Sequence, residues 1–338
     1  MAGPTDISEN CLTLSPPVAL APLAGITDLP FRRLVASFGA GLVVSEMVAS
    51  QEVVQARPGT REKAELDLNG PQTAVQLAGR DPYWMAEAAK LVAGRGAQII
   101  DINMGCPAKK VTSGYSGSAL MRDLDHALTL IDAVVAAVNV PVTLKTRLGW
   151  DDAQLNAADL AQRAESAGVK RITVHGRTRC QFYKGHADWG AIRAVKSSVS
   201  IPVIANGDIT DVPTAQRALA LSKADGVMVG RGAQGKPWVL AQIAHGLGWG
   251  PSPVVPWGGA LYDVIASHYR AVLTFYGTEL GGRVFRKHLG WYLDTIGEST
   301  IVPAGLRRDM LTTKSSAQVL TLLRGICDEH ENPGTRAA

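Results

Sequence analysis

Cysteine is the most chemically versatile residue in this sequence, and one of its four copies stands apart from the rest. Cys106 ends the apolar run IIDINMGC (99–106) and is followed by a proline and then by a segment rich in Gly, Ser and Lys. A free cysteine is commonly a small buried apolar residue. The position of Cys106 at the end of a strand-like run, before a segment with the composition of a mobile cover, instead favours a functional thiol.

The remaining cysteines argue against two other kinds of chemistry. They are Cys11, Cys180 and Cys327. All are far apart in the sequence, and none forms a CxxC pair. This pattern indicates a chain with reduced thiols, without a disulfide framework and without a metal site.

Other reactive side chains also lie where apolar runs end. The end positions that can hydrogen-bond or ionise are Glu46, Gln76, Asn103, Lys145, Arg147, His175, Arg177, Asn206, Asp208 and Arg231. Each alone is weak evidence, because a buried glutamine often only satisfies backbone groups and a strand-end lysine is usually solvated. If the runs are parallel strands of one barrel, however, these side chains converge on the carboxyl-terminal end of that barrel, here called the mouth.

Two of these ends predict a phosphate site. Asn206-Gly207-Asp208 closes the seventh run, and Gly230-Arg231-Gly232 closes the eighth. Many barrels bind a phosphate at this place, where glycine allows close backbone approach and an arginine adds a fixed charge. The alternative is that Gly207 and Gly230 only make tight turns. A flavin held there by its phosphate would place its ring near Lys145, whose charge would stabilise the reduced ring.

The elements that must position these residues form a regular series. Eight β-rich apolar runs cover 18–25, 42–48, 73–79, 99–106, 142–149, 171–178, 203–209 and 225–232. Helical patterns separate them at 28–38, 81–93, 123–138, 154–167, 188–199 and 212–221, with Asp28 and Asp123 as expected N-caps. Nearly continuous apolar runs suit parallel strands that are covered on both faces. We therefore predict a (β/α)8 TIM barrel over 1–248, with a doubly wound open sheet as the alternative.

The chain changes character after residue 248. A Pro/Gly-rich linker at 251–260 precedes helical patterns at 261–277, 283–296, 306–311 and 316–327, which predict an all-α helical domain over 249–338. Arg283, Arg286 and Lys287 share one helix face by their spacing. Such a stripe suits the phosphates of a nucleic acid, although a solvated helix face is the alternative.

Composition limits the class of protein without defining it. The chain has 338 residues, is 46% hydrophobic and 19% charged, and has a net charge of +4, which permits a polyanionic partner but does not require one. The N-terminus MAGPTDISEN lacks a signal peptide pattern, and no apolar stretch is long enough to span a bilayer. We expect a cytoplasmic protein with no membrane association.

Seven sequence blocks together resemble the bacterial tRNA-dihydrouridine synthase family. They are APLAGITDLPFR (21–32), DINMGCPAKKV (101–111), LKTRLGW (144–150), ITVHGRTR (172–179), IPVIANGDI (201–209), GVMVGRGAQGKPW (226–238) and RKHLGWYL (286–293). The last block is similar to the B subgroup. The resemblance implies an FMN-containing barrel and a C-terminal domain that binds tRNA. It also implies an enzyme that uses NADPH to reduce D-loop uridines in tRNA. Separately, we expect a monomer without an obligate protein partner.

The resemblance also implies roles for individual residues. The FMN contacts would be Pro22, Leu23, Ala24, Gln76, Lys145, His175, Asn206, Gly207, Asp208, Gly230 and Arg231. Cys106 would donate a proton to uracil C5 after hydride transfer from flavin N5 to C6. Asn103 and Arg177 would lie near the uracil, and Arg283, Arg286 and Lys287 would contact the tRNA.

Two other functions remain open at this point. One is an FMN-dependent oxidoreductase of small pyrimidines, of the dihydroorotate type, on the same barrel. The extra helical domain and its basic stripe argue against it. The other is a non-enzymatic RNA-binding or regulatory protein on a barrel that has lost its activity. The complete set of polar strand ends argues against that reading.

Overall fold

The computed structural model describes residues 7–8, 11–12, 14–57, 65–66 and 73–331. The chain forms two compact units. One comprises residues 1–232 and 239–251, and the other comprises 233–238 and 252–338.

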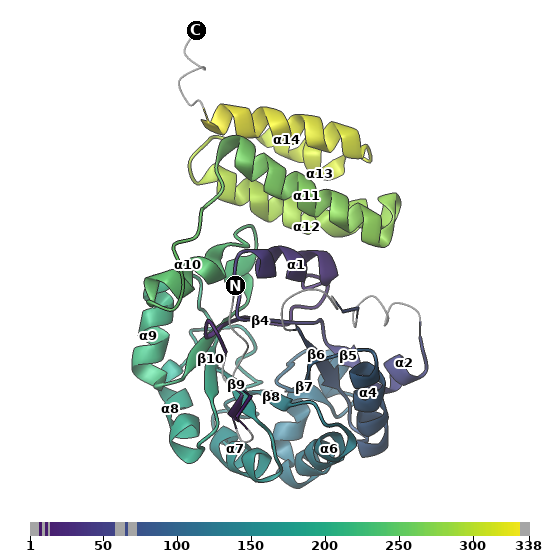
Figure 1. Ribbon diagram of the computed structural model, residues 1–338, viewed down its shortest axis with the longest axis vertical. Coiled ribbons are helices and arrows are strands. Elements are labelled where there is room, and N and C mark those ends of the chain that lie inside the picture. Colours follow the sequence, from purple (N-terminus) through teal and green to yellow (C-terminus); the bar gives the residue numbers. More distant parts are fainter. Residues whose placement is uncertain (1–6, 9–10, 13, 58–64, 67–72, 332–338) are drawn as a thin grey trace. The chain divides into compact units, whose positions relative to one another are not determined.

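The first unit is a closed barrel of parallel strands surrounded by helices (Figure 1). Its strands are β3 (Val18–Leu20), β4 (Leu42–Val44), β5 (Val48–Ala49), β6 (Thr73–Ala78), β7 (Ile99–Met104), β8 (Val142–Arg147), β9 (Arg171–His175), β10 (Val203–Asn206) and β11 (Gly226–Val229). They are hydrogen-bonded in the order β4-β3-β11-β10-β9-β8-β7-β6-β5, and a further β4–β6 pairing closes the ring. The second predicted strand is split into β4 and β5, so the eight predicted runs give a (β/α)8 TIM barrel. The predicted fold is confirmed.

The surrounding helices follow the predicted series. They are α1 (Leu29–Ser37), α2 (Ser50–Val54), α4 (Pro82–Gly94), α6 (Leu124–Ala137), α7 (Ala157–Ser166), α8 (Trp189–Ser198), α9 (Val212–Ser222) and α10 (Val239–Gly246). The expected N-caps are confirmed, because Asp28 accepts a hydrogen bond from the N–H of Phe31 and Asp123 accepts one from the N–H of His126. The sequence did not lead us to expect α2 or α10.

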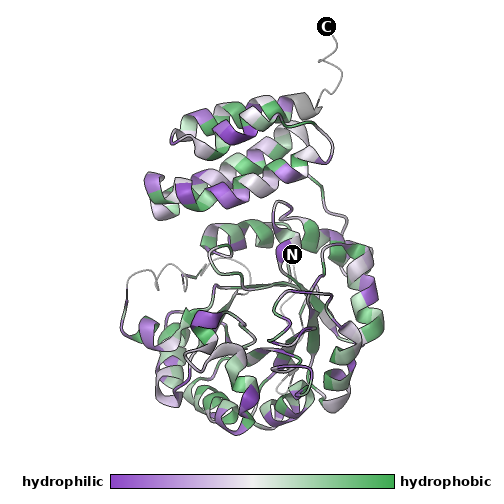
Figure 2. Ribbon diagram, turned by 180° about the vertical axis from the view of Figure 1, so that it is seen from behind, coloured by the Kyte–Doolittle hydropathy of each residue, from purple (hydrophilic) through white to green (hydrophobic). Residues whose placement is uncertain are grey.

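Apolar side chains fill the amino-terminal end of the barrel. Leu12 lies in β2 (Cys11–Leu12), which pairs with β1 (Ile7–Ser8) in a short antiparallel ribbon. The backbone N–H of Leu12 donates to the carbonyl of Lys170, just before β9. Leu12 and Leu14 are buried in one cluster with residues of the barrel strands, including Ile99 and Ile204. This packing fills the amino-terminal end of the barrel. The polar strand ends lie at the opposite end, the mouth, because all barrel strands are parallel. The hydropathy colouring in Figure 2 shows the strands as predominantly apolar.

The segment after Cys106 is more structured than its composition predicts. It forms a short helix α5 (Lys109–Thr112) and a 3-10 helix η1 (Gly117–Arg122). Gly117 has φ +60°, and a Cβ there would lie 2.8 Å from the carbonyl oxygen of Cys106. The glycine is therefore needed for close packing against the strand end.

The second unit contains four helices, as the sequence predicts for this region. They are α11 (Gly258–Tyr276), α12 (Thr278–Gly297), α13 (Ala304–Thr312) and α14 (Ser316–Glu331). An aromatic core holds α11 and α12 together, with the rings of Tyr269 and Phe285 stacked at 4.6 Å. Among the described residues of the whole chain, no helix is long and apolar enough to cross a membrane.

Candidate active site

Strand register brings the predicted polar residues side by side at the mouth. Asn103 on β7 pairs with Lys145 on β8, and Arg147 at the end of β8 pairs with His175 at the end of β9. His175 in turn pairs with Asn206 on β10. Consecutive parallel strands therefore form one continuous band of groups that can donate, accept or carry charge.

A buried hydrogen-bond relay, defined here as Asp101, Gln76 and Asn103, leads to Cys106. The Asp101 carboxylate accepts bonds from the Thr143 hydroxyl at 2.6 Å and from Gln76 Nε2 at 2.7 Å. Gln76 Oε1 accepts from Asn103 Nδ2 at 2.7 Å. Asn103 Oδ1 then accepts from the backbone N–H of Cys106 at 2.9 Å.

The direction of this relay follows from its first member. A carboxylate can only accept, so it turns the Gln76 amide with its NH2 group toward Asp101 and its oxygen toward Asn103. That orientation turns the Asn103 oxygen toward the N–H groups of Gly105 and Cys106. Burial raises the pKa of Asp101 overall, and the hydrogen bonds from Thr143 and Gln76 offset only part of that rise. The relay fixes the backbone that carries the thiol.

Cys106 is held from its carbonyl side as well. Its carbonyl oxygen accepts bonds from the Ser118 hydroxyl at 2.9 Å and from the Ser118 N–H at 3.1 Å. The side chain is partly exposed, unlike that of Cys327 in the second unit, which is buried. Cys106 is thus a partly accessible thiol on a doubly anchored backbone.

Arg147 ties the Cys106 segment to the loop after β9. Its guanidinium donates to the carbonyls of Gly105 at 2.8 Å, Thr178 at 2.9 Å and Phe182 at 2.8 Å. The side chain is buried, and burial lowers its pKa to about 10. It remains charged at neutral pH, so it adds positive charge to the mouth beside the thiol.

Lys145 is the second buried cation. Its Nζ donates to Asn206 Oδ1 at 3.1 Å, and Asn206 Nδ2 donates to the carbonyl of Met228. Burial and the charge of Arg147 lower the pKa of Lys145 to about 8, whereas Asp101 and Cys106 raise it. Lys145 is therefore predominantly charged at neutral pH, and it is the cation of the mouth whose charge is most sensitive to pH.

His175 lies among these cations as a neutral ring. Burial lowers its pKa well below the usual range, and the charges of Arg147, Lys145 and Arg177 lower it further. Its Nδ1 is buried without a hydrogen-bond partner among the described residues. A buried ring nitrogen with no partner is unusual, and it faces surroundings with excess positive charge.

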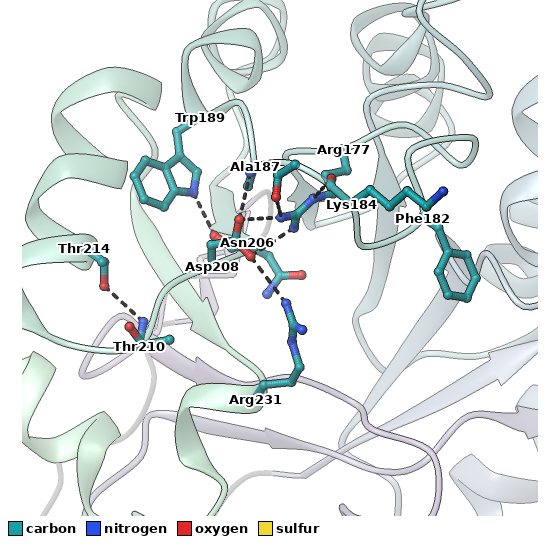
Figure 3. A network of polar contacts seen from close by, with 12 residues as sticks. Arg177, Phe182, Lys184, Ala187, Trp189, Asn206, Asp208, Thr210, Thr214 and Arg231 are labelled. Atoms are coloured by element: carbon teal, nitrogen blue, oxygen red, sulfur yellow. Dashed lines mark hydrogen bonds and ion pairs between the residues drawn. The ribbon is translucent and has the colours of Figure 1, made fainter.

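Arg177 and Arg231 converge on Asp208 (Figure 3). Arg177 makes a two-point contact, with Nη1 at 3.0 Å and Nη2 at 2.5 Å from the carboxylate oxygens. It also donates to the carbonyls of Lys184 and Gly185. Burial raises the pKa of Asp208, but hydrogen bonds from Arg177 and from the Ala187 N–H outweigh this and lower the pKa overall.

These contacts place Arg177 in the framework of the β9–α8 loop. Four of its five N–H donors are used within the protein, and its side chain is buried. Arg231 differs, because its side chain is 59% exposed and its contact with Asp208 is a single long one, with Nη2 at 3.4 Å from Oδ1. Arg231 can therefore turn toward a ligand at little cost. The sequence alone did not predict that Arg177 is held within the protein whereas Arg231 is exposed.

The two glycines of the predicted phosphate site are not equivalent. Gly207 has φ +109°, and a Cβ there would lie 2.8 Å from Ala187 Cβ, so packing alone requires glycine. Gly230 has only two side chains, Ala21 and Leu23, at 3.7 Å from its added Cβ. The tight-turn interpretation therefore accounts for Gly207, whereas a Cβ at Gly230 would make only ordinary van der Waals contacts, so packing does not require glycine there.

Three further predicted residues lie in the turn after β3. Pro22, Leu23 and Ala24 directly follow β3, with Ala24 exposed. Leu23 is held in a turn by a hydrogen bond from its N–H to Thr27 Oγ1 at 2.9 Å. Glu46 holds the same turn at Gly25, because its carboxylate accepts a hydrogen bond from the N–H of Gly25 at 2.6 Å.

The basic stripe belongs to the second unit. Arg283, Arg286 and Lys287 are all exposed on α12, while Phe285, His288 and Leu289 are buried. Arg283 makes one weak contact with Glu279 at 3.8 Å. The predicted helix face is therefore exposed, as its spacing requires.

Comparison with known proteins identifies the family. The model of the dihydrouridine synthase family matches residues 19–325. The chain belongs to the dihydrouridine synthase family. The resemblance drawn from the sequence blocks is confirmed, and so is the prediction of an enzyme.

Relatives of this dihydrouridine synthase cover nearly the whole chain. A probable tRNA-dihydrouridine synthase of Rhodobacter capsulatus is 61% identical over 326 residues, which is 96% of this chain and 99% of that protein. The tRNA-dihydrouridine synthase B of Vibrio cholerae is 44% identical, covering 91% of this chain and 95% of that protein. A solved 2-naphthoyl-CoA reductase complex has a TM-score of 0.54 at 11% identity, covering 68% of this chain and 50% of that one. This last likeness concerns the fold alone.

Proposed function

We propose that this dihydrouridine synthase reduces the C5–C6 double bond of D-loop uridines in tRNA, with FMN as cofactor and NADPH as reductant. The observation that carries the proposal is the anchored Cys106 thiol. It lies beside buried Lys145 and Arg147 at the mouth of a barrel whose family is named for dihydrouridine synthesis and whose relatives are named for that synthesis in tRNA.

The residues of the mouth fit a flavin that bears a phosphate. The cations Lys145, Arg147, Arg177 and Arg231 outnumber the carboxylates near them, and they all act on His175. The Nδ1 of His175, which has no partner among the described residues, offers a hydrogen bond, and packing does not require a glycine at position 230. An anionic cofactor would use the excess charge, whereas a neutral one would leave it uncompensated.

The residues that would hold FMN are those at the ends of the strands. Arg231, Gly230 and the 206–208 turn would bind the phosphate, while Lys145, His175 and Gln76 would contact the ring, with Pro22, Leu23 and Ala24 beside it. Bound FMN supplies the hydride that is added to uracil C6. Lys145 would place a positive charge close to the flavin ring, and this charge would stabilise the ring in its reduced form.

Cys106 supplies the second hydrogen. Reduction of a carbon–carbon double bond requires one hydride and one proton. As charge builds on the carbonyl side of the uracil, the Sγ proton moves to C5, and the thiolate is then reprotonated from solvent. A positioned thiol is one of the side chains that can act as a general acid. The Asn103 and Ser118 contacts restrict the backbone of Cys106, so they orient the Sγ.

Asn103 and Arg177 act near the uracil in different ways in this proposal. Asn103 Nδ2 has one hydrogen that its bond to Gln76 does not use, and that hydrogen is available to a uracil oxygen. Arg177 has one N–H beyond its contacts with Asp208, Lys184 and Gly185. Its main contribution is then to position the loop, with one donor left for the base.

The helical region 249–338 binds tRNA in this proposal, and residues 1–248 form the catalytic domain. The exposed stripe of Arg283, Arg286 and Lys287 contacts phosphates, which positions the RNA without reading its sequence. We propose a monomeric, cytoplasmic enzyme.

The test supplies the purified protein with FMN and NADPH and offers three substrates in parallel. We expect dihydrouridine, measured by mass spectrometry of digested nucleosides, to form in a folded tRNA transcript. We expect none from free uridine, and no oxidation of dihydroorotate. Turnover of the small substrates without turnover of tRNA would favour the small-pyrimidine oxidoreductase.

A further inference from the structure

Two arginines at the barrel mouth share one tryptophan ring. The guanidinium carbon of Arg122 lies 4.4 Å from the ring centroid of Trp150, and that of Arg179 lies 4.8 Å from it. Arg122 ends η1, Trp150 follows β8, and Arg179 lies in the loop after β9. We call these three residues the arginine–tryptophan cluster.

Backbone contacts hold the cluster in place beside the proposed proton donor. The N–H of Arg179 donates to the carbonyl of Gly149 at 3.0 Å, and the N–H of Cys180 donates to the carbonyl of Trp150 at 2.9 Å. On the other side, η1 is anchored by Ser118, which donates twice to the carbonyl of Cys106. The cluster is therefore a fixed feature of the same mouth as Cys106.

The charges of the cluster are not neutralised by the protein. Within the described parts of the chain, neither Arg122 nor Arg179 has a carboxylate within salt-bridge distance. Arg163 shows the contrast, because it pairs with both Asp125 and Asp159. The Nε of Arg179 is buried and also lacks a hydrogen-bond partner among the described residues.

Nearby carboxylates are used for other contacts. Asp123 caps α6 and accepts from the Tyr115 hydroxyl at 3.3 Å. Asp151 accepts from the N–H of Ala153 at 3.1 Å. Two like charges held against one ring repel each other, so the arrangement is most stable when an anion lies between or above them.

We infer that the arginine–tryptophan cluster is a clamp for the phosphates of the tRNA strand next to the reacting uridine. A guanidinium stacked on an aromatic ring keeps its plane fixed, and its N–H groups can bind a phosphate at two points. The Arg122 guanidinium also lies 5.8 Å from the centroid of the Tyr115 ring, which further restricts its orientation. This inference rests on the proposed function and adds the RNA contact of the barrel itself.

The test measures the dissociation constant of the FMN-loaded protein for a tRNA transcript at several salt concentrations. For the double variant Arg122→Gln/Arg179→Gln we expect the dissociation constant to rise at least about tenfold. We also expect the slope of its logarithm against log salt to fall by about 1.4 to 1.8, because two phosphate contacts are lost. Oxidation of NADPH without tRNA should be unchanged.

Two further variants sharpen the result. Arg193→Gln removes an exposed arginine of α8 and serves as the matched control, with tRNA affinity unchanged. Trp150→Ala removes no charge but frees both guanidiniums, so it should weaken tRNA binding by a smaller factor than the double variant. The inference is overturned if the double variant has the affinity and salt slope of Arg193→Gln. Wild-type protein that binds tRNA but forms no dihydrouridine would instead contradict the proposed function, and the clamp would then be judged on affinity alone.

Discussion

Both units of the molecule bury histidine, but in opposite surroundings. His175 at the barrel mouth is neutral because of burial and because the cations Arg147, Lys145, Arg177 and Arg231 surround it. His268 and His288 in the helical unit are neutral chiefly because of burial, and the pKa of His288 falls to about 3. The surroundings of His175 are polar and carry excess positive charge. Those of His268 and His288 are a packed aromatic core.

Contacts explain this difference. The His268 ring lies 5.1 Å from the Phe285 ring and 4.8 Å from the His288 ring, and its Nδ1 is 3.0 Å from the Tyr292 hydroxyl. These side chains stabilise the pairing of α11 with α12. The barrel mouth holds a net positive charge that folding alone would disfavour. We therefore place the proposed chemistry at the mouth, whereas the histidines of the helical unit contribute to its packing.

The largest effect is expected from removing the thiol. Cys106→Ala should lower turnover on tRNA by about 10²- to 10⁴-fold, because the proton donor is lost, while flavin absorbance of the purified protein is retained. Cys180→Ala is the matched control, since Cys180 is an exposed cysteine in the loop after β9, and it should keep wild-type turnover. Equal activity of the two variants would remove Cys106 from the mechanism.

A second, smaller effect concerns the charge of the mouth. Because the pKa of Lys145 is about 8, its charge is lost as the pH rises through that value. We expect the affinity of the FMN-free protein for FMN to fall above pH 8. In Lys145→Gln the affinity should be at least about tenfold weaker at pH 7 and independent of pH over this range. Fluorescence titration of FMN measures both. Lys90→Gln, at an exposed position of α4, should behave as wild type.

A third prediction tests the relay. Asp101→Asn replaces an acceptor by a group that can also donate, so the Gln76 and Asn103 amides lose their fixed orientation. We expect kcat on tRNA to fall about tenfold with little change in KM, since the backbone of Cys106 is less well held. Thr143→Val removes only a donor to Asp101 and should have a smaller effect. A change in KM alone, with kcat intact, would contradict the positioning role of Asp101.

The helical core provides the smallest expected effect, and it should appear only in stability. The folded-state pKa values of His268 and His288 lie below the unfolded value near ~6.5, so the unfolded chain binds more protons below that pH. The stability contributed by these neutral rings should therefore be complete above pH 6.5 and fall as the pH drops below it, by about 2 kcal/mol at pH 5 for His288.

Thermal unfolding followed by circular dichroism at pH 7 and pH 5 measures this dependence. The variant His268→Phe/His288→Phe should lose less stability between the two pH values than the wild type does. An identical loss in both proteins would show that other groups cause the acid sensitivity.

The sequence predicted the barrel well because its signals are local. Apolar runs, aspartate caps and the four helical patterns of the tail each depend on residues close together in the chain. It also predicted that the strand ends share one mouth, since parallel topology makes that unavoidable.

Pairings across the barrel could not be predicted in the same way. Asp101 looked like part of an apolar run, and only the register of β6 with β7 places it opposite Gln76. The Arg177–Asp208 contact and the arginine–tryptophan cluster depend on how loops after different strands fold toward one another. The segment after Cys106 has a flexible composition, yet the packing of Gly117 and Ser118 against Cys106 gives it the ordered form of α5 and η1.

The most direct test of the proposed reaction is a single turnover of the wild-type protein without oxygen. FMN in the protein is first reduced with a limiting amount of NADPH, and tRNA transcript is then added. We expect the flavin absorbance to return and dihydrouridine to appear in the tRNA in an equal amount. Flavin that stays reduced in the presence of tRNA, or that reoxidises without forming dihydrouridine, would contradict it.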